Sequence, residues 1–477
     1  MKEKSIAKNS FYNLIYKGFT ALFPLLTTSY ISRVLMPEGV GAVAYANTVV
    51  TYFVTIAALG IPNYGVKLIA SYRSDENKRS NSFLELVTIN AVSTLVCIVI
   101  YYILVNATSL FCGKIPLMNT MGILLILNFF NIDWFYQGLE EYGYITTRSI
   151  IIKIISFVLM LFLVKSRDDF LIYALILCFA TAGNYFLNVL NARKYLSVNR
   201  KEKIEYKKHL KPVFVLLASA LATEVYTMLD TVMLEYFQGD AAVGYYTNAI
   251  KIVRMIYTVT IAMVATFYPR ISSLYAEGRR EDVNGLLSIG TKVILLISIP
   301  AVVGLIGTAD YIVPILLGES FMPSVLILRI LAILVFVFSI AYILGHVVLM
   351  ATGNEKVILK ATICGALVNA VMNLCLIPRL SGEGAALASI SAEIIVTTVM
   401  LFSSRKYFKL SITRDFVMSV LVSCFLMSLS VIAVKQTFSN YGLGLIVTIF
   451  VAIILYLMGL TITKNEVLIM LAKRIKR

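Results

Sequence analysis

Residues 441–463 read YGLGLIVTIFVAIILYLMGLTIT, a stretch of 23 residues without a charged side chain. A helix needs about 20 apolar residues to cross the hydrocarbon core of a bilayer, so this stretch is long enough to span it. The whole 477-residue chain has the same character, with 59% hydrophobic and 14% charged residues and a mean hydropathy of +0.85. Soluble domains carry about 25% charged residues. The composition therefore excludes a set of soluble domains and predicts an all-α, polytopic membrane protein.

Windows of this length predict about fourteen transmembrane helices. They are expected near residues 10–33, 41–63, 82–105, 116–138, 148–164, 170–192, 211–236, 242–268, 288–309, 325–350, 357–378, 383–403, 415–434 and 441–463. We expect an N-terminal six-helix bundle at 1–192, a basic linker at 193–210, a second bundle at 211–404 and a final helix pair with a basic tail at 405–477. The linker is too short to hold a catalytic domain, so function belongs to the helices and no enzyme activity is expected.

Lysine and arginine are distributed unevenly over the loops between these spans. If the N-terminus is cytoplasmic, about 31 of the 42 basic residues fall in cytoplasmic segments and about 6 in outer loops. Such a bias is typical of membrane proteins, whose cytoplasmic loops are rich in lysine and arginine. It predicts that both termini are cytoplasmic. It also accounts for the formal net charge of +16 without a nucleic-acid partner.

The sequence carries no motif for a metal, a cofactor or a nucleotide. Neither HExxH nor CxxC nor a phosphate-binding glycine loop occurs, and the 6 cysteines are too scattered for a disulfide framework. The two histidines are far apart and have no acidic neighbour in the sequence. We expect His346 to pack in a helix and His209 to lie at a loop edge, so no cofactor or metal is predicted.

Basic residues within or next to the spans are the first candidates for function. A charge near the bilayer centre costs several kcal/mol unless it faces a partner or a water-filled cavity. The candidates are Lys17, Arg148, Lys153, Lys251 and Arg254. Because lysine and arginine bind phosphate, this set predicts a cationic cavity for an anionic substrate. For Lys17 and Lys153, snorkelling of the side chain to the membrane interface is the alternative.

Acidic residues also fall inside the spans. They include Glu224, Asp230 and Glu393. The seventh and eighth spans form a hairpin that turns near Gly239. Equal distances from this turn put Glu224 level with Arg254, and Asp230 close to Lys251. Either these charges form ion pairs that join two helices, or they line a cavity in which a carboxylate takes up a proton or a sodium ion.

The segment DWFYQG at 133–138 combines an acid with aromatic side chains at the end of the fourth span. Tryptophan and tyrosine prefer the membrane interface, so Trp134 and Tyr136 would anchor this helix end. Aromatic faces beside polar groups also stack on sugar rings. Contact of Trp134 and Tyr136 with a sugar is therefore the second interpretation.

Several short motifs, in order along the chain, resemble the bacterial polysaccharide biosynthesis family. They are NSFYN at 9–13, RVLMPEGVG at 33–41, LGIPNYG at 59–65, DWFYQG at 133–138, LDTVML at 229–234 and GYYTNA at 244–249. This family includes the Wzx-type flippases of O-antigen and capsule repeat units, which are related to multidrug exporters and lipid II flippases. The resemblance covers most of the chain and is densest before residue 280.

The resemblance implies two six-helix bundles that form a V around a central cavity, with a final helix pair. It implies that an oligosaccharide on undecaprenyl pyrophosphate moves from the cytoplasmic to the outer leaflet of the bacterial inner membrane by alternating access. The lipid tail would stay in the membrane, and polysaccharide polymerase machinery would be a partner. The alternatives are a lipid II flippase and a drug or cation antiporter on the same fold. An antiporter predicts an acidic cavity, whereas the charges inside the spans are slightly cationic.

Overall fold

The computed structural model describes residues 6–197, 205–265, 267–408, 412–438 and 440–475, with side chains at Phe19 and, within these ranges, from Phe23 to Met470. These residues form helices and turns and contain no strand, which confirms the predicted all-α class. The chain divides into two compact units, residues 1–232 (unit 1) and 233–477 (unit 2). Each unit is described by itself below.

Ten helices in the described residues are long and apolar enough to cross a membrane, or eleven if the bent pair Asp240–Ala262 and Phe267–Ala276 is one span. Two of the ten, Phe23–Ser71 with 49 residues and Glu355–Ser404 with 50 residues, are each long enough for two crossings. A shorter apolar segment covers Ile115–Phe130. When each long helix counts twice and the bent pair and the short segment once each, the apolar segments number about fourteen, as predicted.

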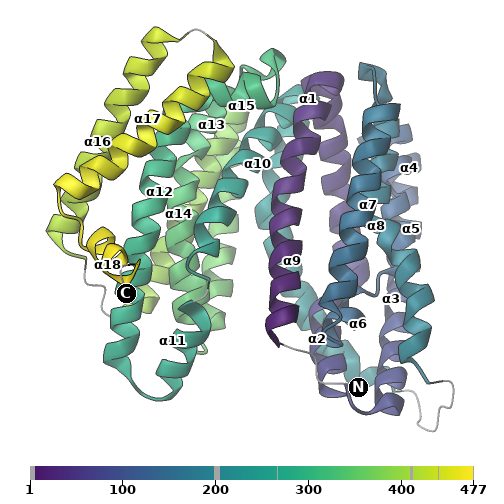
Figure 1. Ribbon diagram of the computed structural model, residues 1–477. Coiled ribbons are helices and arrows are strands. Elements are labelled where there is room, and N and C mark those ends of the chain that lie inside the picture. The colour runs from purple at the N-terminus through teal and green to yellow at the C-terminus, as the bar shows by residue number, and fades with distance from the viewer. Residues whose placement is uncertain (1–5, 198–204, 266, 409–411, 439, 476–477) are drawn as a thin grey trace. The chain divides into compact units, whose positions relative to one another are not determined.

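Unit 1 is a helical bundle (Figure 1). Two clusters of apolar side chains form its core. Its helices are α1 (Ile6–Ala58), α2 (Ile61–Ser71), α3 (Glu76–Ala107), α4 (Ile115–Met121), α5 (Ile123–Leu127), α6 (Asp133–Gly138), α7 (Tyr142–Leu163), α8 (Phe170–Ala192) and most of α9 (Lys207–Gln238). The first cluster contains Tyr101, whose hydroxyl donates to the Met118 carbonyl at 2.7 Å. The second contains Phe83 and Phe135, whose rings lie edge to face at 4.8 Å. Both clusters join helices that are distant in sequence.

A proline divides α1 into two helices. Met36 has φ 61° and ψ 177°, outside the helical region, and Pro37 follows it. The residue before a proline is sterically disfavoured in the α conformation, and proline is well suited to the first turn of the next helix. The predicted spans at 10–33 and 41–63 are therefore separate, with the break at the expected place.

A second break divides α15 (Glu355–Ser404). Ser381 has φ 50° and ψ −128° inside this helix. Close by, a Cβ atom on Gly384 would lie 2.6 Å from the Leu376 carbonyl oxygen, so only glycine permits this approach of the two halves. The break separates the predicted spans at 357–378 and 383–403.

The first part of α9 packs against the second apolar cluster of unit 1. Val213 is fully buried in the second cluster. A Cβ atom on Gly60, which has φ 74°, would lie 2.7 Å from the Val213 carbonyl oxygen and from the Leu217 nitrogen. The boundary between the two compact units falls after Val232, inside α9. The predicted division at the linker 193–210 stays a prediction.

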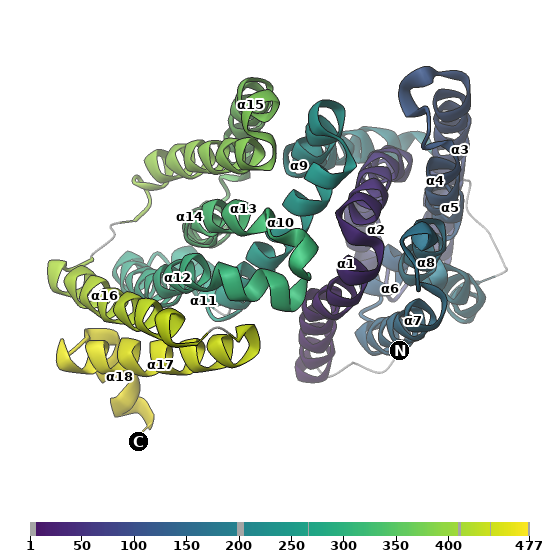
Figure 2. The ribbon, with the colours of Figure 1, turned by 90° about the horizontal axis from the view of Figure 1, so that it is seen from above.

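Unit 2 contains α10 (Asp240–Ala262), α11 (Phe267–Ala276), α12 (Arg280–Leu316), α13 (Ser324–Leu331), α14 (Ile333–Tyr342), the π-helix η6 (Ile343–Leu349), α15, α16 (Arg414–Thr437), α17 (Tyr441–Ile462) and α18 (Glu466–Ile475). Figure 2 shows α16 and α17 side by side, and both contact α12. Pro300 in α12 has no N–H, so the Leu296 carbonyl loses its helical donor. The Tyr456 hydroxyl from α17 donates to this oxygen at 2.7 Å. This bond helps to fix the final helix pair on α12.

Candidate functional site

Arg148, on α7, is held inside unit 1. Its Nη2 donates to Asp133 Oδ1 at 2.7 Å and its Nη1 donates to the Asn184 carbonyl at 3.3 Å. The guanidinium also lies 5.7 Å from the Tyr136 ring centre and 5.1 Å from that of Tyr144. Only 5% of the side chain is exposed. Arg148 thus neutralises a carboxylate within the bundle, which differs from the predicted role as a cation of an open cavity.

Trp134 and Tyr136 are core residues of unit 1. Trp134 is 3% exposed and Tyr136 is fully buried. A Cβ atom on Gly65 would lie 2.4 Å from the indole ring, so α2 and α6 are in direct contact. The Tyr136 hydroxyl donates to the Asn188 carbonyl. In this structure neither ring is open to a sugar, in contrast to the second interpretation of DWFYQG. The segment packs the bundle instead.

Lys153, another predicted substrate cation of unit 1, is partly accessible. It lies on α7 and is half-buried. Its ammonium lies 5.9 Å from the Phe19 ring centre and 5.8 Å from that of Phe23, both on α1. Aromatic faces attract a cation at such distances. Lys17 also belongs to α1, but its side chain lies outside the described residues.

Lys251 and Arg254 lie on α10 of unit 2, and both side chains are exposed at the surface of this unit. They are three residues apart and therefore share one face of the helix. Lys251 Nζ donates to Asn248 Oδ1 at 3.3 Å. The cationic face of α10 thus carries a neutral hydrogen-bonding residue beside its two positive charges.

The acidic candidates are divided between the units. Asp230 in α9 and Glu393 in α15 are each 5% exposed, and Glu224 in α9 is half-buried. The chain turns at Gly239, which has φ 77° and separates α9 from α10, at the position where the sequence predicts a turn. The proposed pairing of these acids with Lys251 and Arg254 stays a prediction, since Glu224 and Asp230 belong to unit 1.

A buried acid–histidine pair was missed by the sequence analysis. His209 Nε2 lies 2.8 Å from Glu85 Oε2, and His209 Nδ1 lies 2.9 Å from the Tyr64 hydroxyl. Glu85 Oε1 also accepts from the Glu205 N–H at 2.6 Å and from Lys208 Nζ at 3.3 Å. The expectation that His209 lies at a loop edge without an acidic partner is therefore wrong. The cluster ties the start of α9 to α2 and α3.

Among the described residues, no group of three or more histidine, cysteine, aspartate or glutamate side chains could hold a metal ion. Together, the two helical units and about ten apolar helices define a multi-pass membrane protein.

Two family models match the sequence. The polysaccharide biosynthesis protein model matches residues 6–275, and the MatE model matches residues 216–375. The first match covers more than half of the chain. The chain therefore belongs to the polysaccharide biosynthesis protein family, as its motifs suggested.

Individual relatives agree with this assignment. The "Putative O-antigen transporter" of Escherichia coli (strain K12) is 24% identical over 410 residues, which cover 84% of this chain and 97% of the relative. The "Probable low-salt glycan biosynthesis flippase Agl15" of Haloferax volcanii is 24% identical over 184 residues, 39% of either chain. The solved structure "Lipid II flippase MurJ, inward closed conformation" has a TM-score of 0.74 and 17% identity, and covers 96% of this chain and 99% of that chain. This last likeness shows a shared fold.

Proposed function

We propose that this protein is a flippase that moves an oligosaccharide repeat unit, linked to undecaprenyl pyrophosphate, from the cytoplasmic to the outer leaflet of the bacterial inner membrane. Membership of the polysaccharide biosynthesis protein family and the names of the relatives support this proposal. The structural observation that carries it is the exposure of two cations, Lys251 and Arg254, midway along α10. This helix and α11 together form a bent pair that is apolar enough to cross a membrane.

The physical problem in such transport is the charge of the pyrophosphate. About 30 Å of hydrocarbon separates the two headgroup regions, and a charged group at its centre costs several kcal/mol. Lys251, Arg254 and Lys153 would offer charge-assisted hydrogen bonds to the phosphate oxygens part of the way across. The lipid tail can stay in the bilayer throughout. In this proposal Lys17 assists from α1, whereas Arg148 is already neutralised by Asp133.

Because the sequence has no nucleotide-binding motif, energy for directed transport would come from a substrate gradient, an ion gradient or the membrane potential. Asp230 and Glu393 are carboxylates at membrane depth, each 5% exposed, and Glu224 lies on the same helix as Asp230. Carboxylates kept at such depth are often parts of proton or ion pathways. We propose that one of them takes up a proton or a sodium ion during the transport cycle, with both chain termini in the cytoplasm.

Leaflet exchange of a fluorescent undecaprenyl-pyrophosphate oligosaccharide in proteoliposomes tests the flippase proposal. Loss of a hydrogen bond to a charged group costs about 1.5–3 kcal/mol, so Lys251→Gln and Arg254→Gln should each slow exchange about ten- to a hundredfold. Arg279→Gln is the matched control, because Arg279 is an exposed arginine in a loop of the same unit. Equal exchange rates in folded Lys251→Gln, Arg254→Gln and the control would overturn the assignment of these cations.

The MatE match over residues 216–375 favours one competing function, a drug or cation antiporter. The shared fold with the MurJ structure makes a lipid II flippase the other. Parallel assays with a cationic dye and with fluorescent lipid II separate the three. We expect the oligosaccharide-linked lipid to be exchanged and the dye to be retained. Faster transport of the dye than of the lipid would favour the antiporter.

A further inference from the structure

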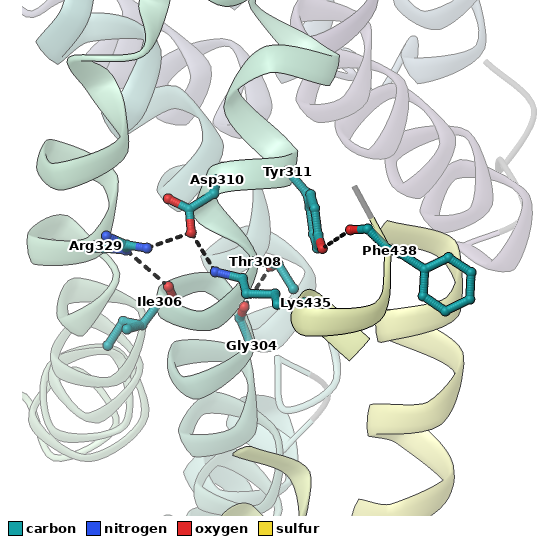
Figure 3. Close-up of polar contacts among 8 residues, drawn as sticks. All are labelled: Gly304, Ile306, Thr308, Asp310, Tyr311, Arg329, Lys435 and Phe438. Atoms are coloured by element: carbon teal, nitrogen blue, oxygen red, sulfur yellow. Dashed lines mark hydrogen bonds and ion pairs between the residues drawn. The ribbon is translucent and has the colours of Figure 1, made fainter. Parts of the chain in front are cut away.

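One end of unit 2 carries a cluster in which two cations share a single carboxylate oxygen (Figure 3). Asp310 Oδ2, on α12, accepts from Arg329 Nη2 of α13 at 2.6 Å. The same oxygen accepts from Lys435 Nζ of α16. Arg329 Nε also donates to the Ile306 carbonyl at 3.3 Å. The three charged residues, called the Asp310 cluster below, join α12 and α13 to the final helix pair.

The Asp310 cluster has an excess of positive charge. One carboxylate faces two cations, so the sum is one positive charge, and no other ion pair of these three side chains occurs among the described residues. Arginine and lysine have several N–H donors each, and most of them are not used by the contacts within the cluster. The side chains of Arg329, Asp310 and Lys435 are 37%, 36% and 25% exposed. An anion can therefore reach the unused donors.

The surroundings of the cluster are those of a lipid-facing surface. Ile306, Leu326 and Ile432 are exposed apolar residues on α12, α13 and α16. Asp310 lies six residues before the end of α12 and Lys435 two residues before the end of α16. At 1.5 Å per residue these positions are within about 10 Å of the helix ends. This depth corresponds to the boundary between hydrocarbon and headgroups.

We propose that the Asp310 cluster binds the phosphate group of a membrane lipid. A cation pair with one positive charge in excess matches a phosphate, and the apolar residues beside it match an acyl or prenyl chain. The sequence pattern supports a local function for these cations. With the predicted cytoplasmic N-terminus, Lys435 falls in the outer loop between the spans at 415–434 and 441–463, and Arg329 lies near the outer end of the span at 325–350. Lysine and arginine are otherwise rare on this side in the predicted topology. The lipid is either a bilayer phospholipid or a polyprenyl-linked phosphate, and only the second source rests on the proposed function.

Binding of two phosphate-bearing lipids to the delipidated, detergent-solubilised protein tests this proposal. The probes are phosphatidylglycerol and undecaprenyl phosphate, with diacylglycerol as the phosphate-free reference, and native mass spectrometry measures the occupancy. Lys435→Gln should weaken binding of at least one phosphate lipid about tenfold and leave diacylglycerol unchanged. Asp310→Asn removes the competing carboxylate charge and should tighten binding several-fold. Preference for phosphatidylglycerol identifies a bilayer lipid, and preference for undecaprenyl phosphate identifies a subsite for the transported lipid.

Lys165→Gln is the matched control, because Lys165 is an exposed lysine that the sequence also predicts on the outer side. It should bind both probes like the unmodified protein. If Asp310→Asn does not fold, Lys435→Arg replaces it, and this variant should retain binding because it keeps the charge. The proposal is overturned if Lys435→Gln and Lys165→Gln bind equally well, or if a folded Asp310→Asn binds phosphate lipids more weakly than the unmodified protein.

Discussion

At the scale of single residues, the contact of His209 with Glu85 should make a large contribution to stability. The Glu85 side chain is 0% exposed and that of His209 is 1% exposed, so a buried carboxylate depends on this ring for one of its hydrogen bonds. His209→Phe preserves the ring and removes both nitrogens. Because Glu85 keeps its bonds to Glu205 and Lys208, the expected loss is about 2 kcal/mol of unfolding free energy.

His346→Phe is the control for this prediction, because His346 is exposed on η6, where its Nδ1 lies 3.1 Å from Met350 Sδ. Thermal unfolding of the two detergent-solubilised variants gives the comparison. We expect a lower melting temperature for His209→Phe and little change for His346→Phe. Equal melting temperatures would show that Glu85 does not depend on the imidazole.

Residue contacts of this kind are visible in the sequence only when the partners are close along the chain. Asp133 and Arg148 are 15 residues apart on either side of one short loop, so their ion pair could have been expected. Glu85 and His209 are 124 residues apart, and no local spacing relates them. Residue type alone predicts Trp134 at a membrane interface, whereas the ring is buried. Its burial depends on Gly65, which leaves space for the indole.

At the scale of elements, α18 is held on α12 by an ion pair that responds to acid. Lys292 Nζ lies 2.8 Å from Glu466 Oε1. The hydrogen bond from Lys292 holds the pKa of the Glu466 carboxyl below its usual value. A carboxyl whose pKa is lower in the folded than in the unfolded protein stabilises the folded state. This contribution is complete when the pH is above the pKa of a free glutamate, about 4.3, and is lost as the pH falls through the lowered pKa of the folded state. Attachment of α18 should therefore be constant near neutral pH and weaken only in acid.

Hydrogen exchange of the amides in α18 measures this attachment. Lys292→Met should increase exchange in residues 466–470 already at neutral pH, because Glu466 then loses its partner. Lys464→Met is the control, since Lys464 is exposed in the turn before α18. Equal protection of α18 in both variants would mean that apolar contacts alone, such as those of the buried Val467, hold the helix in place.

Helix boundaries were predictable from the sequence where proline or glycine interrupts a helix. They were less predictable where buried polar side chains interrupt it. The breaks at Met36–Pro37 and near Gly384 follow from backbone sterics and separate the spans as expected. The span predicted as one helix at 116–138 is instead α4, α5 and α6. Inside it, the buried Asn128 donates to Asn90 at 3.3 Å and to Thr94 at 2.9 Å, so its side chain bonds to α3 at the point where the helix is interrupted.

At the scale of the whole molecule, the class of protein and the approximate number of spans follow from composition and hydropathy alone. The family follows from motifs such as DWFYQG, which the structure explains through packing: Phe135 and Tyr136 are fully buried. The candidate site is less predictable, because its charges come from helices that are far apart in sequence. Lys153 lies in unit 1, whereas Lys251 and Arg254 lie in unit 2.

The predicted orientation of the molecule can be tested with a cysteine that the chain already has. Cys112 is exposed in the turn before α4, on the side predicted to face outward, whereas Cys97, Cys178 and Cys424 are buried. Cys364 and Cys375, both on α15, are also exposed and are therefore replaced by serine in every variant. A membrane-impermeant maleimide should label intact cells that carry this background, and adding Cys112→Ser should abolish the labelling. Cysteine introduced at Ser74, an exposed residue of the turn before α3, should be labelled only in inside-out vesicles of the Cys112→Ser background. Labelling of Ser74→Cys from outside would reverse the topology, and the phosphate site of the Asp310 cluster would then face the cytoplasmic leaflet.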